Sequence, residues 1–87
     1  MKKINFKKFS IYQDILKTKS ADYDIRSQLS DLLFKYGNGM LAHNLCHLIF
    51  ESEAEIELDE RQINYLGEFI EQYCTPAIID SFNELIT

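Results

Sequence analysis

Long apolar runs are missing from this sequence, and residues that interrupt regular structure are scarce, with one proline and three glycines among 87 residues. The longest apolar stretches, near 40–50 and 74–85, are broken by polar residues. Both fall well short of the roughly 20 apolar residues that cross a membrane, so no membrane span is expected. The chain also lacks internal repeats, low-complexity tracts and linkers. We therefore expect a single domain over residues 1–87.

Cysteine is also rare, and both copies stand inside apolar patterns. In such a setting the thiols of Cys46 and Cys74 are expected to act as small hydrophobic side chains rather than to form a disulfide. Residues 1–8 carry lysines but are not followed by the apolar segment and small-residue cleavage site of a secretory signal. Together these observations predict a cytoplasmic protein with reduced thiols.

Charge is divided unevenly along the chain, whose net charge is −5 at pH 7. Residues 1–19 contain six lysines and one aspartate, and residues 20–87 contain three basic and thirteen acidic side chains. The two parts therefore carry net charges of +5 and −10. Such asymmetry is typical of nucleic-acid-binding arms, but pairing of the lysines with the chain's own carboxylates competes with that explanation.

The hydrophobic content of 46%, including 13% aromatic residues, is sufficient for a packed core. The spacing of the apolar residues predicts four helices, at about 23–36, 40–52, 60–74 and 76–86. Asp22 and Asp24 are alternative N-caps of the first helix. The segment Gly37-Asn38-Gly39 is expected to form a tight turn that joins the first helix to an antiparallel second helix.

The last two helices have the clearest starts. Asp59 followed by Gln62 is a capping-box pattern, in which each side chain bonds to the other residue's backbone N–H. Thr75 followed by Pro76 supplies an N-cap hydroxyl and a residue whose missing N–H has no cost in the first turn of a helix. We expect helices to begin directly after Asp59 and Thr75.

Two segments alternate between polar and apolar residues, which predicts strands. Residues 53–58 alternate strictly, and residues 3–11 alternate locally with a change of register in the middle. If the two strands pair, lysines of the first lie across from Glu53, Glu55 and Glu57. The predicted fold is α+β and predominantly helical, with about four short helices and a small two-stranded element. The segment between residues 11 and 22 receives no assignment.

Candidates for chemistry are few. His43 and His47 lie four residues apart, which places both imidazoles on one helix face, as metal ligation requires. The glutamate of a zinc-protease helix is missing between them and no spacing fixes a third ligand, so packing in or near the core is the favoured interpretation. Cys46 lies in an apolar pattern that does not favour a reactive thiol. We expect no enzyme activity, no metal and no cofactor.

Three aromatic residues, Tyr65, Phe69 and Tyr73, recur every four residues along the third predicted helix. They lie beside a separate apolar stripe that includes Leu66 and Ile70, so the apolar arc is wider than one neighbouring helix covers. Either two elements of the chain's own fold cover this arc, or the aromatic residues contact a second chain. We predict the contact, with another copy or with a protein partner.

The N-terminal segment offers an alternative function. Phe6, Phe9 and Tyr12 stand among lysines, a composition that stacks on the bases of single-stranded nucleic acid. The lysines that would contact phosphate are Lys2, Lys3, Lys7 and Lys8. Almost no arginine is available to read bases, and packing of the phenylalanines onto the helices is favoured. The sequence predicts a non-catalytic, self-associating interaction or accessory module, with a nucleic-acid-associated regulator as the alternative.

Overall fold

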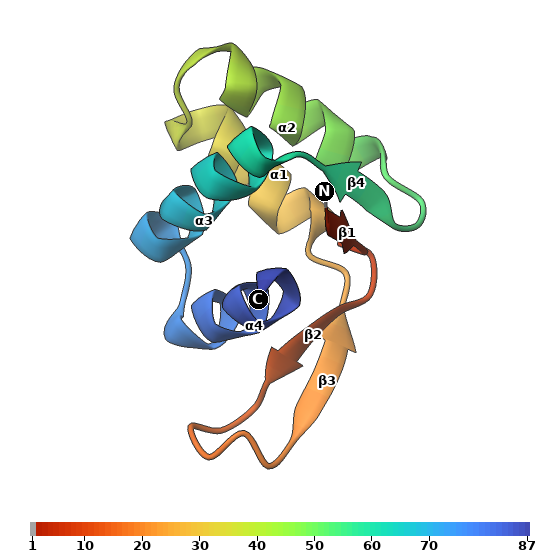
Figure 1. The fold of residues 1–87 in the computed structure, drawn as a ribbon, viewed down its shortest axis with the longest axis vertical. Coiled ribbons are helices and arrows are strands. Elements are labelled where there is room, and N and C mark those ends of the chain that lie inside the picture. Colours follow the sequence, from red (N-terminus) through yellow and green to blue (C-terminus); the bar gives the residue numbers. More distant parts are fainter. Residues whose placement is uncertain (1) are drawn as a thin grey trace.

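A computed structural model describes residues 2–87, which form a mainly helical α+β fold (Figure 1). In chain order the elements are β1 (Lys2–Ile4), β2 (Phe9–Tyr12), β3 (Ser20–Tyr23), α1 (Arg26–Tyr36), α2 (Gly39–Glu51), β4 (Ile56–Leu58), α3 (Glu60–Tyr73) and α4 (Pro76–Ile86). The strands form two separate antiparallel pairs, β1 with β4 and β2 with β3. The predicted fold class is confirmed. Within residues 2–87, none of the helices combines the length and the apolar character that a membrane crossing needs.

The β1–β4 pair is the two-stranded element that the sequence predicts, although it is shorter than expected. Its register places Lys3 across from Glu57 and Ile4 across from Ile56. Ile4 and Leu58 are buried, because alternate side chains of a strand face opposite sides. Lys3 faces outward, and its Nζ lies 3.9 Å from Oε1 of Glu57. The expected pairing of lysine with glutamate is confirmed at this position.

The predicted strand over about residues 3–11 is confirmed only at its start, because β1 ends at Ile4 and a separate strand, β2, begins at Phe9. Asn5 Oδ1 accepts hydrogen bonds from the backbone N–H groups of Lys7 at 3.0 Å and Lys8 at 3.1 Å. This local turn ends β1 and redirects the chain, because a short polar side chain that bonds its own backbone competes with a strand ladder. β2 then pairs with β3, which begins inside the segment that received no assignment from the sequence.

Helix α1 begins at Arg26 rather than at the expected position 23, because the residues up to Tyr23 belong to strand β3. The N-cap residue is Ile25, so the predictions of Asp22 and Asp24 as N-caps are wrong. Asp24 nevertheless supports the helix start, since its Oδ1 accepts a hydrogen bond from the backbone N–H of Arg26 at 3.1 Å. The Arg26 guanidinium donates to both oxygens of the same carboxylate, at 3.0 and 2.9 Å.

Helices α1 and α2 form an antiparallel hairpin (Figure 1). Two glycines in their connection, Gly37 and Gly39, are needed for different structural reasons. Gly37 is extended, and a Cβ there would lie 2.6 Å from the carbonyl oxygen of Leu33 and 2.7 Å from Cβ of Ala42. Gly39 has a φ of +82°, in the region that favours glycine. Glycine is therefore required for close approach at the first position and for backbone conformation at the second.

The predicted start of α3 is confirmed, and that of α4 is confirmed in part. Asp59 Oδ1 accepts from the backbone N–H of Gln62 at 2.8 Å, and Gln62 Oε1 accepts from the backbone N–H of Asp59 at 2.8 Å. α4 begins at Pro76, as expected from its missing N–H. The Thr75 hydroxyl makes no capping hydrogen bond, so the prediction of its role is wrong.

The core lies where the helices meet the N-terminal strands. Its largest fully buried side chains come from all four helices as well as from the N-terminal segment and β4: Phe6, Phe9, Phe82, Ile4, Leu33, Leu45, Ile49, Leu58, Leu66 and Ile70. The rings of Phe6 and Phe9 stack with their centroids 6.1 Å apart. This burial confirms that the two phenylalanines anchor the N-terminal segment. α4 lies beside β2, while the far end of the β2–β3 hairpin projects beyond the helices (Figure 1).

Candidate functional site

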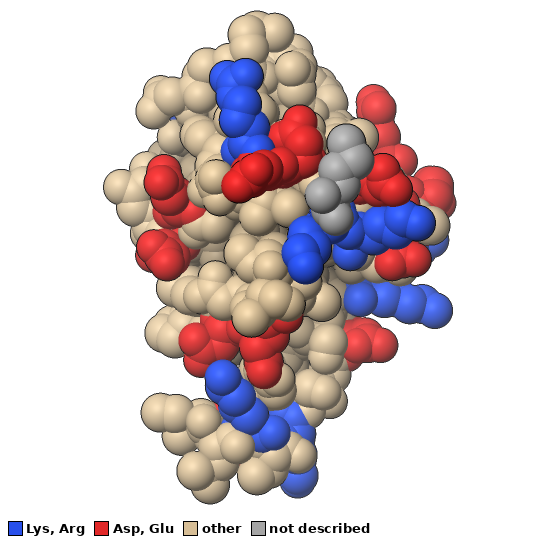
Figure 2. Space-filling view, in the orientation of Figure 1, with Lys and Arg blue, Asp and Glu red and all other residues tan. Residues whose placement is uncertain are grey.

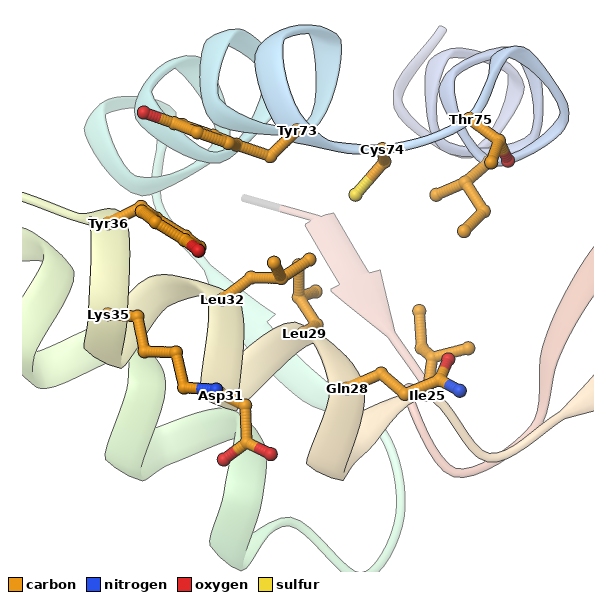
Figure 3. A pocket seen from close by; sticks show the side chains of 11 residues that line it. Ile25, Gln28, Leu29, Asp31, Leu32, Lys35, Tyr36, Tyr73, Cys74 and Thr75 are labelled. Atoms are coloured by element: carbon orange, nitrogen blue, oxygen red, sulfur yellow. The ribbon is translucent and has the colours of Figure 1, made fainter.

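An apolar groove with a volume of about 440 Å³ lies between α1 and the junction of α3 with α4 (Figure 3). Ile25, Leu29 and Leu32 form the wall on the side of α1. Cys74 and Ile78 contribute to the facing wall. The volume falls within the range of about 300–1,000 Å³ that is typical of binding pockets. We use "the groove" for this site from here on.

The two walls of the groove follow from local sequence. Leu29 and Leu33 of α1 are buried in the core, and Leu32, which lies about 100° around the helix from Leu33, is left on the flank and only half-buried. On the other side, Pro76 disfavours helical geometry in the residue before it, so α3 ends and α4 starts within a few residues. Cys74 in this junction points its sulfur towards α1 (Figure 3).

Two stacked tyrosines lie at one end of the groove, which we call its mouth. The rings of Tyr36 from α1 and Tyr73 from α3 lie with centroids 5.2 Å apart and an angle of 12° between their planes. They remain 52% and 42% exposed, although each is in contact with the other. Two amphipathic rings held in parallel at the mouth of an apolar groove present a large, rigid surface to solvent. Tyrosine is among the residue types that are enriched in protein interfaces.

The three aromatic residues predicted from the sequence form a continuous row, but their environments differ. Phe69 is only 5% exposed and belongs to the core, with its ring centroid 4.6 Å from that of Tyr73. Tyr65 is half-buried, and its hydroxyl accepts a hydrogen bond from the backbone N–H of Asn38 at 3.2 Å. The connection between α1 and α2 thus covers part of this flank. Tyr73 is the member of the row that opens onto the groove.

The groove is apolar along its walls and polar at its rim. Asp31 and Lys35 of α1 lie at this rim (Figure 3). Burial raises the pKa of the Cys74 thiol, so this group stays protonated at neutral pH and contributes apolar surface rather than a nucleophile. The chemistry that these side chains support is the burial of an apolar ligand or segment.

The histidines lie elsewhere, on the solvent-exposed side of α2. The ring centroids of His43 and His47 are 4.9 Å apart, in an edge-to-face arrangement. Both are exposed, so the expectation that they pack in or near the core is wrong. In the part of the chain that the structure describes, no three His, Cys, Asp or Glu side chains come together in a way that could hold a metal ion. Cys46 is buried and donates to the carbonyl oxygen of His43.

The N-terminal lysines are exposed, but the aromatic residues among them are not available to nucleic-acid bases. Phe6 and Phe9 are buried, and Tyr12 is half-buried and donates its hydroxyl hydrogen bond to Glu84. Lys3 pairs with Glu57, and Lys7 Nζ lies 3.6 Å from a Glu53 carboxylate oxygen. Figure 2 shows basic and acidic side chains interspersed on this face rather than a continuous basic surface. Of the four predicted phosphate-contacting lysines, Lys2, Lys3, Lys7 and Lys8, two are thus paired with carboxylates of the chain itself.

Sequence patterns do not identify two exposed apolar features of the structure. Tyr36 follows the helical spacing of α1, but nothing in that spacing reveals which side chain it stacks on. Ile15 and Leu16, at the far end of the β2–β3 hairpin, lie in the unassigned segment. The sequence feature that could have indicated their exposure is a pair of adjacent large apolar residues between charged ones, in a stretch whose apolar residues do not recur with a helical period.

Comparisons of the chain with models of protein families, with curated protein sequences and with solved structures find no match. Its function is therefore inferred from the residues and their geometry.

Proposed function

We propose that this protein is a small, non-catalytic interaction module of the cytoplasm that associates with a second copy of itself. The observation that carries the proposal is the groove with the stacked Tyr36 and Tyr73 at its mouth. Burying half-exposed tyrosine rings removes a large apolar area from water while each hydroxyl stays hydrated at the edge of the contact. Tyrosine is enriched in the cores of protein interfaces for this reason.

The size of the domain adds to this support. A chain of 87 residues leaves a larger share of its surface exposed than a longer chain does, so its apolar side chains are more difficult to cover. Beyond the two tyrosines, large apolar side chains such as Ile15 and Leu16 remain exposed. Association of two copies would cover such surface without a second gene product.

The free thiols support the proposed cytoplasmic location, and the side chains of the groove support the proposed non-catalytic role. Cys46 and Cys74 are both free, which is typical of a reducing compartment. The raised pKa of Cys74 disfavours the thiolate that nucleophilic catalysis requires. The walls of the groove are formed mainly by aliphatic side chains such as Leu29, Leu32 and Ile78, with Gln28 and Thr75 as neutral polar residues, and such walls suit binding rather than proton transfer or nucleophilic attack.

Sedimentation equilibrium tests the proposal. We expect a concentration-dependent dimer for the wild type and a monomer for the double variant Tyr36→Ser with Tyr73→Ser, because the mouth of the groove loses its aromatic surface. Phe34→Ser is the matched control, since Phe34 is an exposed aromatic residue of α1 that lies outside the groove. A wild type that stays monomeric up to millimolar concentration would contradict self-association. Loss of the dimer in the Phe34→Ser control alone would assign the contact to another face.

The nucleic-acid alternative has its own test. A mobility shift with single-stranded DNA or RNA that weakens steeply with salt would favour it over an interaction module. The shift would have to disappear when the four lysines are neutralised, in a variant with Lys2→Gln, Lys3→Gln, Lys7→Gln and Lys8→Gln. Stacking on Phe6 and Phe9 cannot contribute without unpacking the core, because both rings are buried.

A further inference from the structure

The far end of the β2–β3 hairpin carries two apolar side chains into solvent. Ile15 is 94% exposed and Leu16 is 79% exposed, the two highest values among large apolar residues in the part of the chain described. We call these two residues the hairpin tip. An apolar pair at the end of a projecting hairpin is costly in water unless it is covered in the functional state.

The loop that carries the hairpin tip is held in one conformation by its own hydrogen bonds. The Asp14 carboxylate accepts from the backbone N–H of Thr18 at 2.8 Å and from the Thr18 hydroxyl. The backbone N–H of Lys17 donates to the carbonyl oxygen of Asp14 at 3.1 Å, and that of Gln13 donates to the carbonyl oxygen of Lys19 at 2.8 Å. The hydrogen bonds from the Thr18 hydroxyl and backbone N–H lower the pKa of Asp14, which keeps its carboxylate ionised. A loop ordered in advance loses little conformational entropy on binding.

We propose that the hairpin tip of one copy inserts into the groove of a second copy. This inference rests on the self-association proposed above and assigns its contacts. A groove of about 440 Å³ has room for the two butyl side chains, since it equals on the order of fifteen water volumes of about 30 Å³ each. Ile15 and Leu16 would meet aliphatic walls that include Leu32 and Ile78, with the Tyr36 and Tyr73 rings covering the entry.

The position of the groove allows the exchange to be reciprocal. A second depression, lined by Ile11 and Tyr23 at the root of the hairpin, shares Ile25 and Ile78 with the groove. The groove therefore continues towards the base of the same hairpin whose tip projects beyond the helices (Figure 1). Two copies related by a twofold axis can lay their hairpins in opposite directions, each tip in the other copy's groove. Such a contact closes on itself and yields a dimer rather than a fibre.

Charge favours the hairpin tip of a second copy as the occupant of the groove over an acidic partner or the acidic body of a second copy. The loop between β2 and β3 carries Lys17 and Lys19 against a single acidic residue, Asp14, and Lys17 pairs with Asp80 of its own chain, so Lys19 is the lysine that can face a partner. The groove is lined by one acidic and one basic side chain, Asp31 and Lys35, but residues 20–87, from which it is built, carry thirteen acidic and three basic side chains. A basic loop that approaches an acidic body is attracted to it, whereas two acidic bodies repel each other. We therefore expect the dimer to weaken with rising salt.

Disulfide trapping with the native thiol of the groove tests the contact directly. The variant Ile15→Cys with Cys74→Ser places a thiol at the tip and removes the one in the groove. Mixed with wild type under mild oxidation, it is expected to form a disulfide-linked heterodimer through the wild-type Cys74. The matched control, Phe34→Cys with Cys74→Ser, exposes a thiol outside the groove and is expected to remain uncrosslinked. The tip variant alone is expected to remain monomeric under denaturing, non-reducing conditions.

Three outcomes would overturn the inference. A linked homodimer of the tip variant alone would assign the contact to two tips rather than to a tip and a groove. Equal crosslinking of the control would show that the Cys74 reaction has no positional specificity. No crosslink from either variant, in a protein that sedimentation shows to be a dimer, would place the tip away from the groove.

Sedimentation of Ile15→Ser with Leu16→Ser separates this inference from the general proposal. We expect the dissociation constant to rise at least about tenfold, because two apolar side chains no longer leave water. The thermal midpoint of the monomer should not change, since neither residue packs in the core. If this variant dimerises like the wild type while Tyr36→Ser with Tyr73→Ser does not, the hairpin assignment is wrong and self-association stands. A monomeric wild type overturns both.

Discussion

The β1–β4 sheet and the β2–β3 hairpin are both short, antiparallel and two-stranded, and both use part of the lysine-rich N-terminal segment. In the first, Ile4 and Leu58 are buried against the helices. In the second, only the root is buried, at Phe9, and the far end stands in water with Ile15 and Leu16 exposed. Two pairs of strands with similar size and the same topology therefore differ in how much of each is buried in the core.

The difference indicates that the core requires only part of the hairpin. Ile4 of β1, Phe6 in the turn that follows it and Phe9 at the start of β2 are the N-terminal side chains that are buried in the core. An isolated two-stranded hairpin is marginally stable in water. Here α4 supports it through the hydrogen bond from Tyr12 to Glu84 and the ion pair between Lys17 and Asp80. Beside these contacts, Ile15 and Leu16 remain exposed.

The largest expected effect lies where the two sheets meet. Phe6→Ala should lower the free energy of unfolding by about 3–5 kcal/mol, because it removes a fully buried ring from between β1 and β2. Ile15→Ala, at the other end of the hairpin, should change it by less than about 0.5 kcal/mol. Urea denaturation of the monomer measures both values. Similar losses for the two variants would contradict the division into a buried root and an independent tip.

A smaller effect is expected at the helix that follows β4 directly. Asp59→Ala should cost about 0.5–2 kcal/mol, since it removes the capping box that begins α3 at the end of the β1–β4 sheet. Thr75→Ala should cost less, because the Thr75 hydroxyl makes no capping bond and Pro76 already lacks the N–H of that turn. Both values come from chemical denaturation. A larger loss for Thr75→Ala would mean that its hydroxyl caps α4 in solution.

Most of the helical fold could be predicted from the sequence, because the apolar residues recur with the 3.6-residue period over more than two turns. The predicted ranges for α2, α3 and α4 agree with the structure to within one residue at either end, and the capping pattern of α3 fixed its start. The start of α1 was three residues early. Its apolar stripe continues backward into Ile25, and the stripe alone does not show that the chain before it is a strand.

The strands were harder to predict, since short alternating segments indicate a strand without indicating its partner. Residues 3–11 alternate with a shift at Lys7-Lys8, which the sequence presents as a bulge. The structure places a turn there, held by Asn5, and sends β2 to a different partner. That choice depends on burying Phe6 and Phe9 together against the helices, which is a tertiary effect.

The candidate site was predicted only in part. Of the aromatic row for which a contact is predicted, Tyr73 is 42% exposed, whereas its neighbour Phe69 is buried in the chain's own core. The spacing of four residues cannot distinguish them, because the α1–α2 connection covers one end of the row and leaves the other open. Whether these residues contact a second chain stays a prediction that the sedimentation experiment decides.

The smallest expected effect concerns acid and the root of the hairpin, where β3 leads into α1. The paired guanidinium of Arg26 and the hydrogen bond from its backbone N–H lower the pKa of Asp24 from 3.8 to about 2. Because the folded state holds this proton less tightly than the unfolded state, the pair's contribution to stability is fully present above about pH 4. It is lost as the pH falls towards 2.

Replacing Asp24 should therefore make the free energy of unfolding decrease less steeply as the pH falls from about 4 to 2. Asp24→Asn is expected to unfold more easily than the wild type at pH 5, with the difference shrinking as the pH approaches 2. The measurement is urea denaturation at intervals of pH between 5 and 2. Asp22→Asn is the control, because it removes an exposed carboxylate from the same hairpin and leaves the Asp24–Arg26 pair intact. The effect should be small, since the Asp24 carboxylate is about half exposed and solvent screens the pair. If the free energies of unfolding of wild type and Asp24→Asn differ by the same amount at every pH, Asp24 acts through its backbone hydrogen bond and its shape rather than through its charge. The root of the hairpin is then held by packing, as the β1–β4 sheet is.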